Sequence, residues 1–175
     1  VTAAAVSTNE DTGVALVINA GRSGDNGASD NSETLSVRIT VRSDGTGPIG
    51  TLTGTAPAGV SFTSLGGGVY SVTAVGADPA AREALIDSFI NGGALTFTPR
   101  AQWSGVLTGP AGIRVDVIST EAASGGELAP LVAEGAPNGV DGPTQTETVT
   151  TYLDITVAPV IDAPTLANAS SNIRE

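Results

Sequence analysis

Acidic residues in this sequence gather in places where they could bind a metal ion. The first is the polar segment 22–33, which places Asp25, Asp30 and Glu33 among asparagines, glycines and serines. Calcium takes roughly six to eight oxygen ligands in flexible geometry, so this segment predicts a Ca²⁺ site, with Asp25 and Asp30 as ligands. It is no EF-hand, because the twelve-residue spacing and the flanking helices are absent. A solvated turn remains the alternative, since the same residue types are favoured in turns.

A second group of acids comes from the two ends of the chain. Glu10 and Asp11 precede a Val-rich run, and Asp162 lies close to the C-terminus. If the strands run up and down in Greek-key order, the first strand ends at the pole from which the last strand leaves. That order would bring Glu10, Asp11 and Asp162 together as metal ligands. The alternative is that Glu10 and Asp11 simply form a turn.

Glu121 ends a strand-like run that should reach the opposite pole, beside the segment that contains Asp25 and Asp30. Each predicted pole then offers acids for an ion. Asp116 and Asp154 fall on the polar side of their runs, and we expect both to be solvated. The Asp44-Gly45 pair is typical of a turn.

The composition removes several kinds of function. The chain has no Cys, His or Met, and it carries 18 Asp and Glu against 7 arginines, a formal charge of -11. Thiolate nucleophiles, Ser-His-Asp triads, zinc sites and disulfides are therefore excluded, which leaves oxygen ligands for hard cations. An acidic chain repels phosphate backbones and anionic lipids, so nucleic-acid and membrane partners are disfavoured. No window approaches the roughly 18 apolar residues of a spanning helix.

An enzyme is not expected either. Two carboxylates could be paired for glycoside hydrolysis, but catalysis needs a concave pocket, and sugar binding usually needs aromatic platforms. The chain has one Trp and two Tyr. Trp103 is more typical of a core or edge anchor. The run Gly66-Gly67-Gly68 opens no helix and so forms no phosphate loop.

The elements that must position these acids are mainly strands. β-branched and polar residues alternate with a period of two, for example Val37 and Ile39 against Arg38 and Thr40, which predicts strands with one buried face. Turn residues separate the runs. We expect strands at 13–19, 34–42, 49–53, 68–75, 94–98, 112–120 and 146–157. The fold class is therefore predicted as an all-β antiparallel Greek-key sandwich.

One segment departs from the strand pattern. Asp78 as N-cap, Pro79 at the first helical position and apolar residues at helical spacing predict a short helix through Ile90, ended by Asn91-Gly92-Gly93. By contrast, the segment 121–145 is rich in Gly, Pro, Ala and Glu without a period. It reads as an extended loop.

The tail repeats the start of the chain. Five positions near the N-terminus align with five near the C-terminus at one constant offset, 165 minus 2 being 163. Thr2, Ala4, Ser7, Thr8 and Asn9 stand against Thr165, Ala167, Ser170, Ser171 and Asn172, and only Thr8 and Ser171 differ in type. We therefore expect a single module at 1–164, with 165–175 as a linker or the start of a next copy in a tandem array.

Several motifs together resemble a known family. They are Asn9-Glu10-Asp11-Thr12, Thr96-Phe97-Thr98-Pro99, Trp103-Ser104-Gly105, the predicted strand 113–121 and the C-terminal segment 153–164, which ends in Asp162-Ala163-Pro164. In this order they look like the cadherin-like or bacterial immunoglobulin-like repeats of giant repeats-in-toxin (RTX) adhesins, which type I secretion exports. The resemblance covers nearly the whole chain.

The resemblance implies an extracellular, Ca²⁺-dependent, monomeric β-sandwich on the bacterial cell surface, with neighbouring repeats of the same chain as its partners. It also implies that Glu10 and Asp162 lie beside an interdomain linker and that Glu121 is the acid ending the penultimate strand. The helix and the long loop depart from the shorter repeats of the family. A ligand-binding module, whose loop 121–145 contacts a glycan or peptide, is therefore the alternative to a structural extender.

Overall fold

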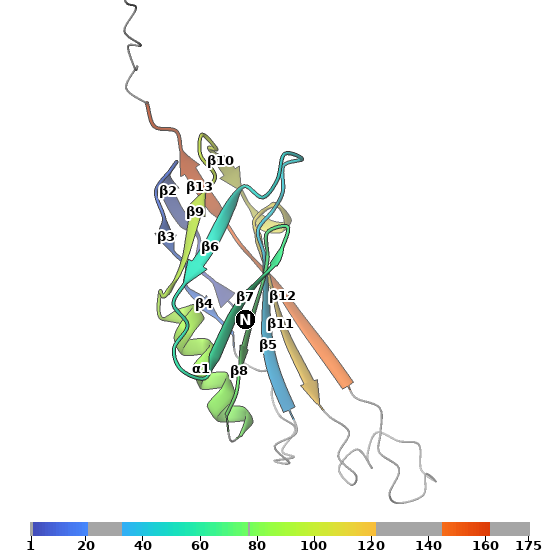
Figure 1. Cartoon of the computed structure of the whole chain (residues 1–175). Coiled ribbons are helices and arrows are strands. Elements are labelled where there is room, and N and C mark those ends of the chain that lie inside the picture. The colour runs from blue at the N-terminus through green and yellow to red at the C-terminus, as the bar shows by residue number, and fades with distance from the viewer. Residues whose placement is uncertain (1, 21–32, 77, 122–144, 162–175) are drawn as a thin grey trace, which may run out of the picture.

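The computed structural model describes residues 2–20, 33–76, 78–121 and 145–161, with the backbone alone at 33, 121 and 145. Strands dominate these residues (Figure 1). The first eight are β1 Thr2–Ala3, β2 Val6–Asn9, β3 Val14–Ala15, β4 Ile18–Asn19, β5 Glu33–Thr40, β6 Gly50–Gly54, β7 Val60–Gly66 and β8 Val69–Ala74. There follow α1 Pro79–Asn91, β9 Leu95–Pro99, β10 Gly105–Leu107, the 3-10 turn η1 Gly109–Ala111, β11 Ile113–Glu121, β12 Gln145–Leu153 and β13 Ile155–Ala158.

The largest sheet has five antiparallel strands in the order β12-β11-β5-β8-β7. Its strands alternate as their sequences predict. On β5, Val37 and Ile39 are fully buried whereas Arg38 is exposed, because successive side chains point to opposite faces of a sheet. Three smaller sheets face it, in the orders β3-β9-β6, β10-β13-β2 and β1-β4. The predicted all-β sandwich is confirmed.

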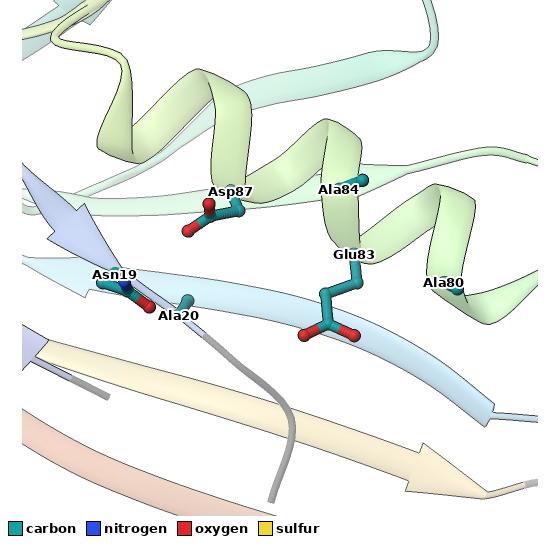
Figure 2. A pocket seen from close by; sticks show the side chains of 6 residues that line it. All are labelled: Asn19, Ala20, Ala80, Glu83, Ala84 and Asp87. Atoms are coloured by element: carbon teal, nitrogen blue, oxygen red, sulfur yellow. The ribbon is translucent and has the colours of Figure 1, made fainter.

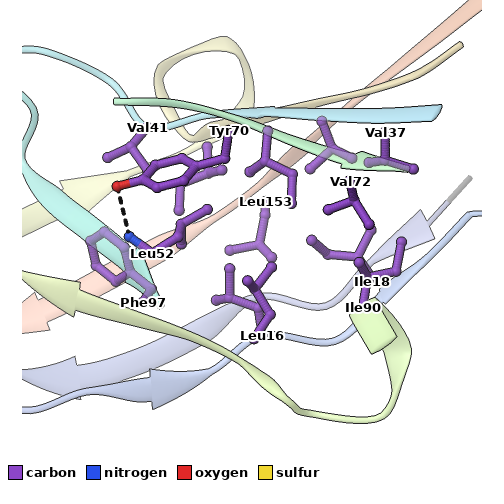
Figure 3. Close-up of a cluster of buried hydrophobic side chains, with 14 of the residues drawn as sticks. Leu16, Ile18, Val37, Val41, Leu52, Tyr70, Val72, Ile90, Phe97 and Leu153 are labelled. Atoms are coloured by element: carbon purple, nitrogen blue, oxygen red, sulfur yellow. Dashed lines mark hydrogen bonds between the residues drawn. The ribbon is translucent and has the colours of Figure 1, made fainter. Parts of the chain in front are cut away.

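The core lies between these layers and is mostly aliphatic. Figure 3 shows Val37, Val72 and Tyr70 of the five-stranded sheet facing side chains of the opposite layer, such as Leu16 and Phe97. One hydrogen bond crosses the core. The backbone N–H of Leu52 on β6 donates to the Tyr70 hydroxyl of β8 over 3.1 Å, so a buried tyrosine ties the two layers together.

The predicted helix is confirmed as α1. The Asp78 carboxylate caps it by accepting a 2.7 Å hydrogen bond from the Ala81 N–H, and Pro79 occupies the first turn. Its buried residues are Ile86, Phe89 and Ile90. The Phe89 ring lies 5.6 Å from that of Phe62 on β7, so α1 packs on the inner face of the five-stranded sheet.

The last predicted strand, 146–157, is divided in the structure. It breaks at Asp154, where the chain passes from the five-stranded sheet, as β12, to the smaller sheet, as β13. There β13 pairs antiparallel with β10 but parallel with β2, in the register Ile155↔Val6 to Ala158↔Asn9. This parallel pair departs from the all-antiparallel prediction, because strand pairing between distant segments has no local sequence signal.

Two further differences concern short or exposed strands. The predicted strand 13–19 is interrupted, so β3 and β4 flank Leu16 and Val17. Sequence reasoning missed β7, because it is an edge strand whose residues are mostly exposed and whose alternation is weak. Gly68 follows it at φ 81°, and a Cβ there would meet the Val41 carbonyl at 2.8 Å. The glycine run therefore serves a tight β7–β8 turn, not a phosphate.

Candidate functional site

The acids near the N-terminus lie where the last strand ends. Glu10 directly follows β2 and is 8% exposed. Its backbone N–H donates to the Ala158 carbonyl at 3.0 Å, and its Oε1 accepts a 2.6 Å hydrogen bond from the Val160 N–H. This contact defines what we call the exit pole: Glu10 and the segment 158–161. The predicted meeting of Glu10 with the end of the last strand is found, but the strand that ends there is β2, which sequence reasoning missed; the predicted first strand, 13–19, follows Glu10 in the chain (Figure 1).

The same residues form a turn, which was the alternative interpretation of this motif, and the metal interpretation stays a prediction. Thr12 donates its N–H to the Asn9 carbonyl at 3.2 Å, and the Thr8 hydroxyl donates to the Thr12 carbonyl at 2.8 Å. Asp11 takes a left-handed conformation at φ 60° and is exposed, which leaves its carboxylate accessible to solvent. Asp162, the third acid expected here, lies outside the described residues.

Glu121 is the last residue of β11, at the end of the sheet opposite the exit pole (Figure 1). The backbone register places it opposite Glu33, the first residue of β5, which directly follows the segment with Asp25 and Asp30. The predicted position of Glu121 beside that segment is thus correct at the level of the backbone. Asp25 and Asp30 themselves lie outside the described residues.

A complete metal shell does not emerge from the described residues alone. Among side chains in 2–20, 34–76, 78–120 and 146–161, no three acids come close enough together to hold an ion. Glu10 and Asp11 supply carboxylates at the exit pole, and oxygen donors of this kind suit calcium. The metal predictions for Glu10, Asp11, Asp25, Asp30, Glu121 and Asp162 stay predictions.

Asp116 is buried, which corrects the expectation that it is solvated. It is 5% exposed, although it lies on the outward side of β11. Its Oδ1 accepts hydrogen bonds from Arg114 Nε at 2.8 Å and from the Thr150 hydroxyl at 2.6 Å. The hydrogen bond to this carboxylate raises the pKa of Arg114 above its ordinary value. Because residues i and i+2 of a strand lie on the same face, the spacing of Arg114 and Asp116 could have predicted this pair.

Asp154 was also expected to be solvated, and it is half-buried at the point where the chain changes sheets. Its Oδ1 accepts a 2.7 Å hydrogen bond from the Gly109 N–H, and its carbonyl accepts one from Val6 at 3.0 Å. It therefore fixes the crossing between layers. Trp103 is half-buried against the core, as expected of an anchor.

The Asp44 turn contains an ion pair that the sequence did not indicate. Asp44 and Arg100 form a two-point contact, with distances of 2.6 and 3.2 Å between guanidinium nitrogens and carboxylate oxygens. Thr46 donates both its N–H and its hydroxyl to the same carboxylate. These bonds, led by the one from Arg100, hold the pKa of Asp44 well below its usual range.

A shallow pocket of about 270 Å³ lies between α1 and the end of β4. Figure 2 shows Glu83 and Asp87 projecting from α1 towards Asn19 and Ala20. Asp87 Oδ1 is buried there and has no hydrogen-bond partner among the residues that the structure describes. The pocket is open, and two alanines of α1 and Ala20 also line it. Sequence reasoning did not foresee it, because it joins residues far apart in the chain.

No protein-family model matches this chain, and no curated protein or solved structure matches it. The described residues contain one α-helix, α1, of 13 residues. It is not long and apolar enough to cross a membrane.

Proposed function

We propose that this chain is a calcium-stiffened structural extender repeat of a bacterial surface adhesin, acting outside the cell and without enzymatic activity. It would join neighbouring repeats of the same chain and project distal ligand-binding domains for cell-surface adhesion or biofilm formation. The single observation that carries the proposal is the contact between the Glu10 carboxylate and the Val160 N–H, where the last strand ends.

The direction of the strands supports a role in a linear array. Because β2 and β13 are parallel, the chain runs towards the same pole in both strands. A neighbour joined beyond β13 would continue in this direction rather than fold back beside the sandwich. Val160 and Ile161, just past β13, are 45% and 97% exposed. Apolar side chains at this position would suit the interface with a following domain.

The distribution of acids supports calcium as the stiffening agent. The exit pole carries Glu10 and Asp11, with Asp162 one residue beyond the described segment. At the other pole Glu121 and Glu33 are paired in the register of β11 and β5. Carboxylates supply the oxygen ligands that calcium prefers.

The test is thermal unfolding of the chain in excess chelator and in millimolar Ca²⁺, with Mg²⁺ as the competing ion. At a calcium concentration about one hundred times the dissociation constant, mass action adds about 2.7 kcal/mol per site. For a domain of this size that corresponds to a Tm increase of about 5 to 10 °C. Equal Tm values in chelator and in Ca²⁺ would refute the calcium part of the proposal.

Variants locate the ion. Glu10→Gln keeps an oxygen to accept the Val160 N–H but removes the charge, so it should reduce the calcium-dependent Tm shift more than it changes the Tm in chelator. Asp162→Asn should act in the same direction. Glu147→Gln is the matched control, because it removes the same charge from exposed β12. A Glu10→Gln shift equal to that of the parent chain would exclude Glu10 as a ligand.

A further inference from the structure

The outward side of the five-stranded sheet differs in chemistry from the rest of this acidic chain. Its residues alternate with the buried ones, and no described element covers it. We call it the outer sheet face. Besides Arg38, Arg114, Asp116, Tyr152 and the half-buried Val69 and Ile118, it is lined mostly by hydroxyl groups: Thr34, Ser36, Thr40, Ser61, Thr63, Ser71, Thr73, Thr120, Thr146, Thr148 and Thr150.

The outer sheet face is locally positive on a chain with a net charge of -11. Arg38 and Arg114 lie on it. Arg42 is exposed and comes directly after buried Val41, so the alternation along the chain places it on the same face. Within the described part of the chain, neither Arg38 nor Arg42 forms an ion pair or a side-chain hydrogen bond. The carboxylate of Asp116, nearly inaccessible, is the one acid among the described side chains of this face.

Arg114 is held in place by Asp116. Its Nε donates to Asp116, which the Thr150 hydroxyl also holds, while the arginine side chain stays 51% exposed. The terminal nitrogens of the guanidinium make no other side-chain bond in the described residues. An arginine already fixed at one nitrogen loses less conformational entropy when its planar fork binds an oxyanion.

The three arginines lie within reach of one ligand. Arg114 is opposite Thr40 in the register of β11 and β5, so Arg38 is its diagonal neighbour. Diagonal neighbours on one sheet face are about 7–8 Å apart. Arg42 continues the row two residues past Thr40. Three guanidinium groups are thus spread along adjacent strands and are flanked by hydroxyls.

We propose that the outer sheet face binds an anionic polysaccharide whose sugars carry carboxylates. Guanidinium groups bind carboxylates through paired, charge-assisted hydrogen bonds, and the surrounding threonines and serines match the hydroxyls of a sugar chain. A protein partner would need a larger apolar interface core than Val69, Ile118 and Tyr152 provide among the hydroxyl groups of this face. A nucleic acid would find a single tyrosine, Tyr152, on this face for base stacking. The inference does not depend on calcium.

The experiment measures binding of alginate oligosaccharides to the full chain on a biosensor, in chelator so that no cation bridges the two acidic molecules. Neutral dextran, dextran sulfate and single-stranded DNA are run in parallel. Alginate should bind and should weaken as salt rises, while neutral dextran should not bind. The double substitution Arg38→Gln with Arg42→Gln should weaken alginate binding about tenfold or more.

The control is Arg82→Gln, which removes one positive charge from α1, away from the outer sheet face, and is compared with Arg38→Gln and Arg42→Gln made singly; it should stay within about twofold of the parent chain. Arg114→Lys keeps the charge but loses the planar fork, and it should weaken binding less than Arg114→Gln does. Unfolding curves establish that each variant is folded. Equal loss with Arg82→Gln, equal binding of dextran, no binding of alginate, or preference for DNA or dextran sulfate would each overturn the proposal.

Discussion

At the scale of residues, the ionic contacts were the least accessible to sequence reasoning. Arg114 and Asp116 are separated by one residue, and their alternation shows that they share a face. The burial of Asp116, however, depends on Thr150, a residue of the neighbouring strand β12. Asp44 likewise finds its partner Arg100 far along the chain. A sequence read locally can place an acid on a polar face but cannot say which distant cation meets it.

The Asp44 ion pair makes stability depend on pH. Because the folded-state pKa of Asp44 is held below its ordinary value of 3.8, its contribution to stability is present above that value and is lost as pH falls towards the folded-state pKa. Asp44→Asn should therefore lower the Tm at neutral pH, and the difference from the parent chain should narrow below about pH 4. Both side chains are about one-third exposed, so the effect is modest and weakens in salt.

The measurement is Tm against pH for both chains, at low and at high salt. Ser43→Ala, next in the same turn, serves as the control and should show no such narrowing. A Tm difference that stays constant through the acidic range would mean that the Asp44 charge does not stabilise the fold.

At the scale of elements, local signals predicted what local chemistry determines. The Asp78 cap, Pro79 and the apolar spacing predicted α1, and alternation predicted β5 and β11 nearly in full. The parallel pairing of β2 with β13 could not be predicted in the same way, because its register depends on contacts between chain ends. The exit pole was nonetheless anticipated, since up-and-down topology limits where those ends can lie.

Tyr70 provides a test of how the layers are held together. Tyr70→Phe keeps the ring but removes the hydroxyl that accepts the hydrogen bond from the buried Leu52 N–H of β6. That N–H would then lose this partner. We expect the free energy of unfolding to fall by about 1 to 3 kcal/mol in urea titrations. Tyr152→Phe is the matched control, because Tyr152 is on the outer sheet face and should change stability little. Equal effects of the two substitutions would show that the hydrogen bond between layers does not stabilise the fold.

At the scale of the whole molecule, charge and topology divide the surface by function. Acids lie at the two poles of the sandwich, where the proposed ions would stiffen an array, while arginines and hydroxyls lie on the outer sheet face between them. The alternation along β5 and β11 separates one face from the rest, so the two proposals concern different surfaces and can be tested independently.

The parallel pair of β2 and β13 also determines how the molecule would respond to tension. If force pulls the chain apart at its two ends, these strands are drawn in opposite directions along a common axis, so their backbone hydrogen bonds are sheared together rather than unzipped one by one. Val6 bonds to Asp154 at one end of the pair, and Glu10 bonds to Ala158 and Val160 at the other. Glu10→Ala should therefore lower the unfolding force in single-molecule pulling, a rate-governed quantity. An unchanged force would place the mechanical resistance elsewhere. Glu10, which the sequence predicts as a metal ligand, would then also resist mechanical unfolding.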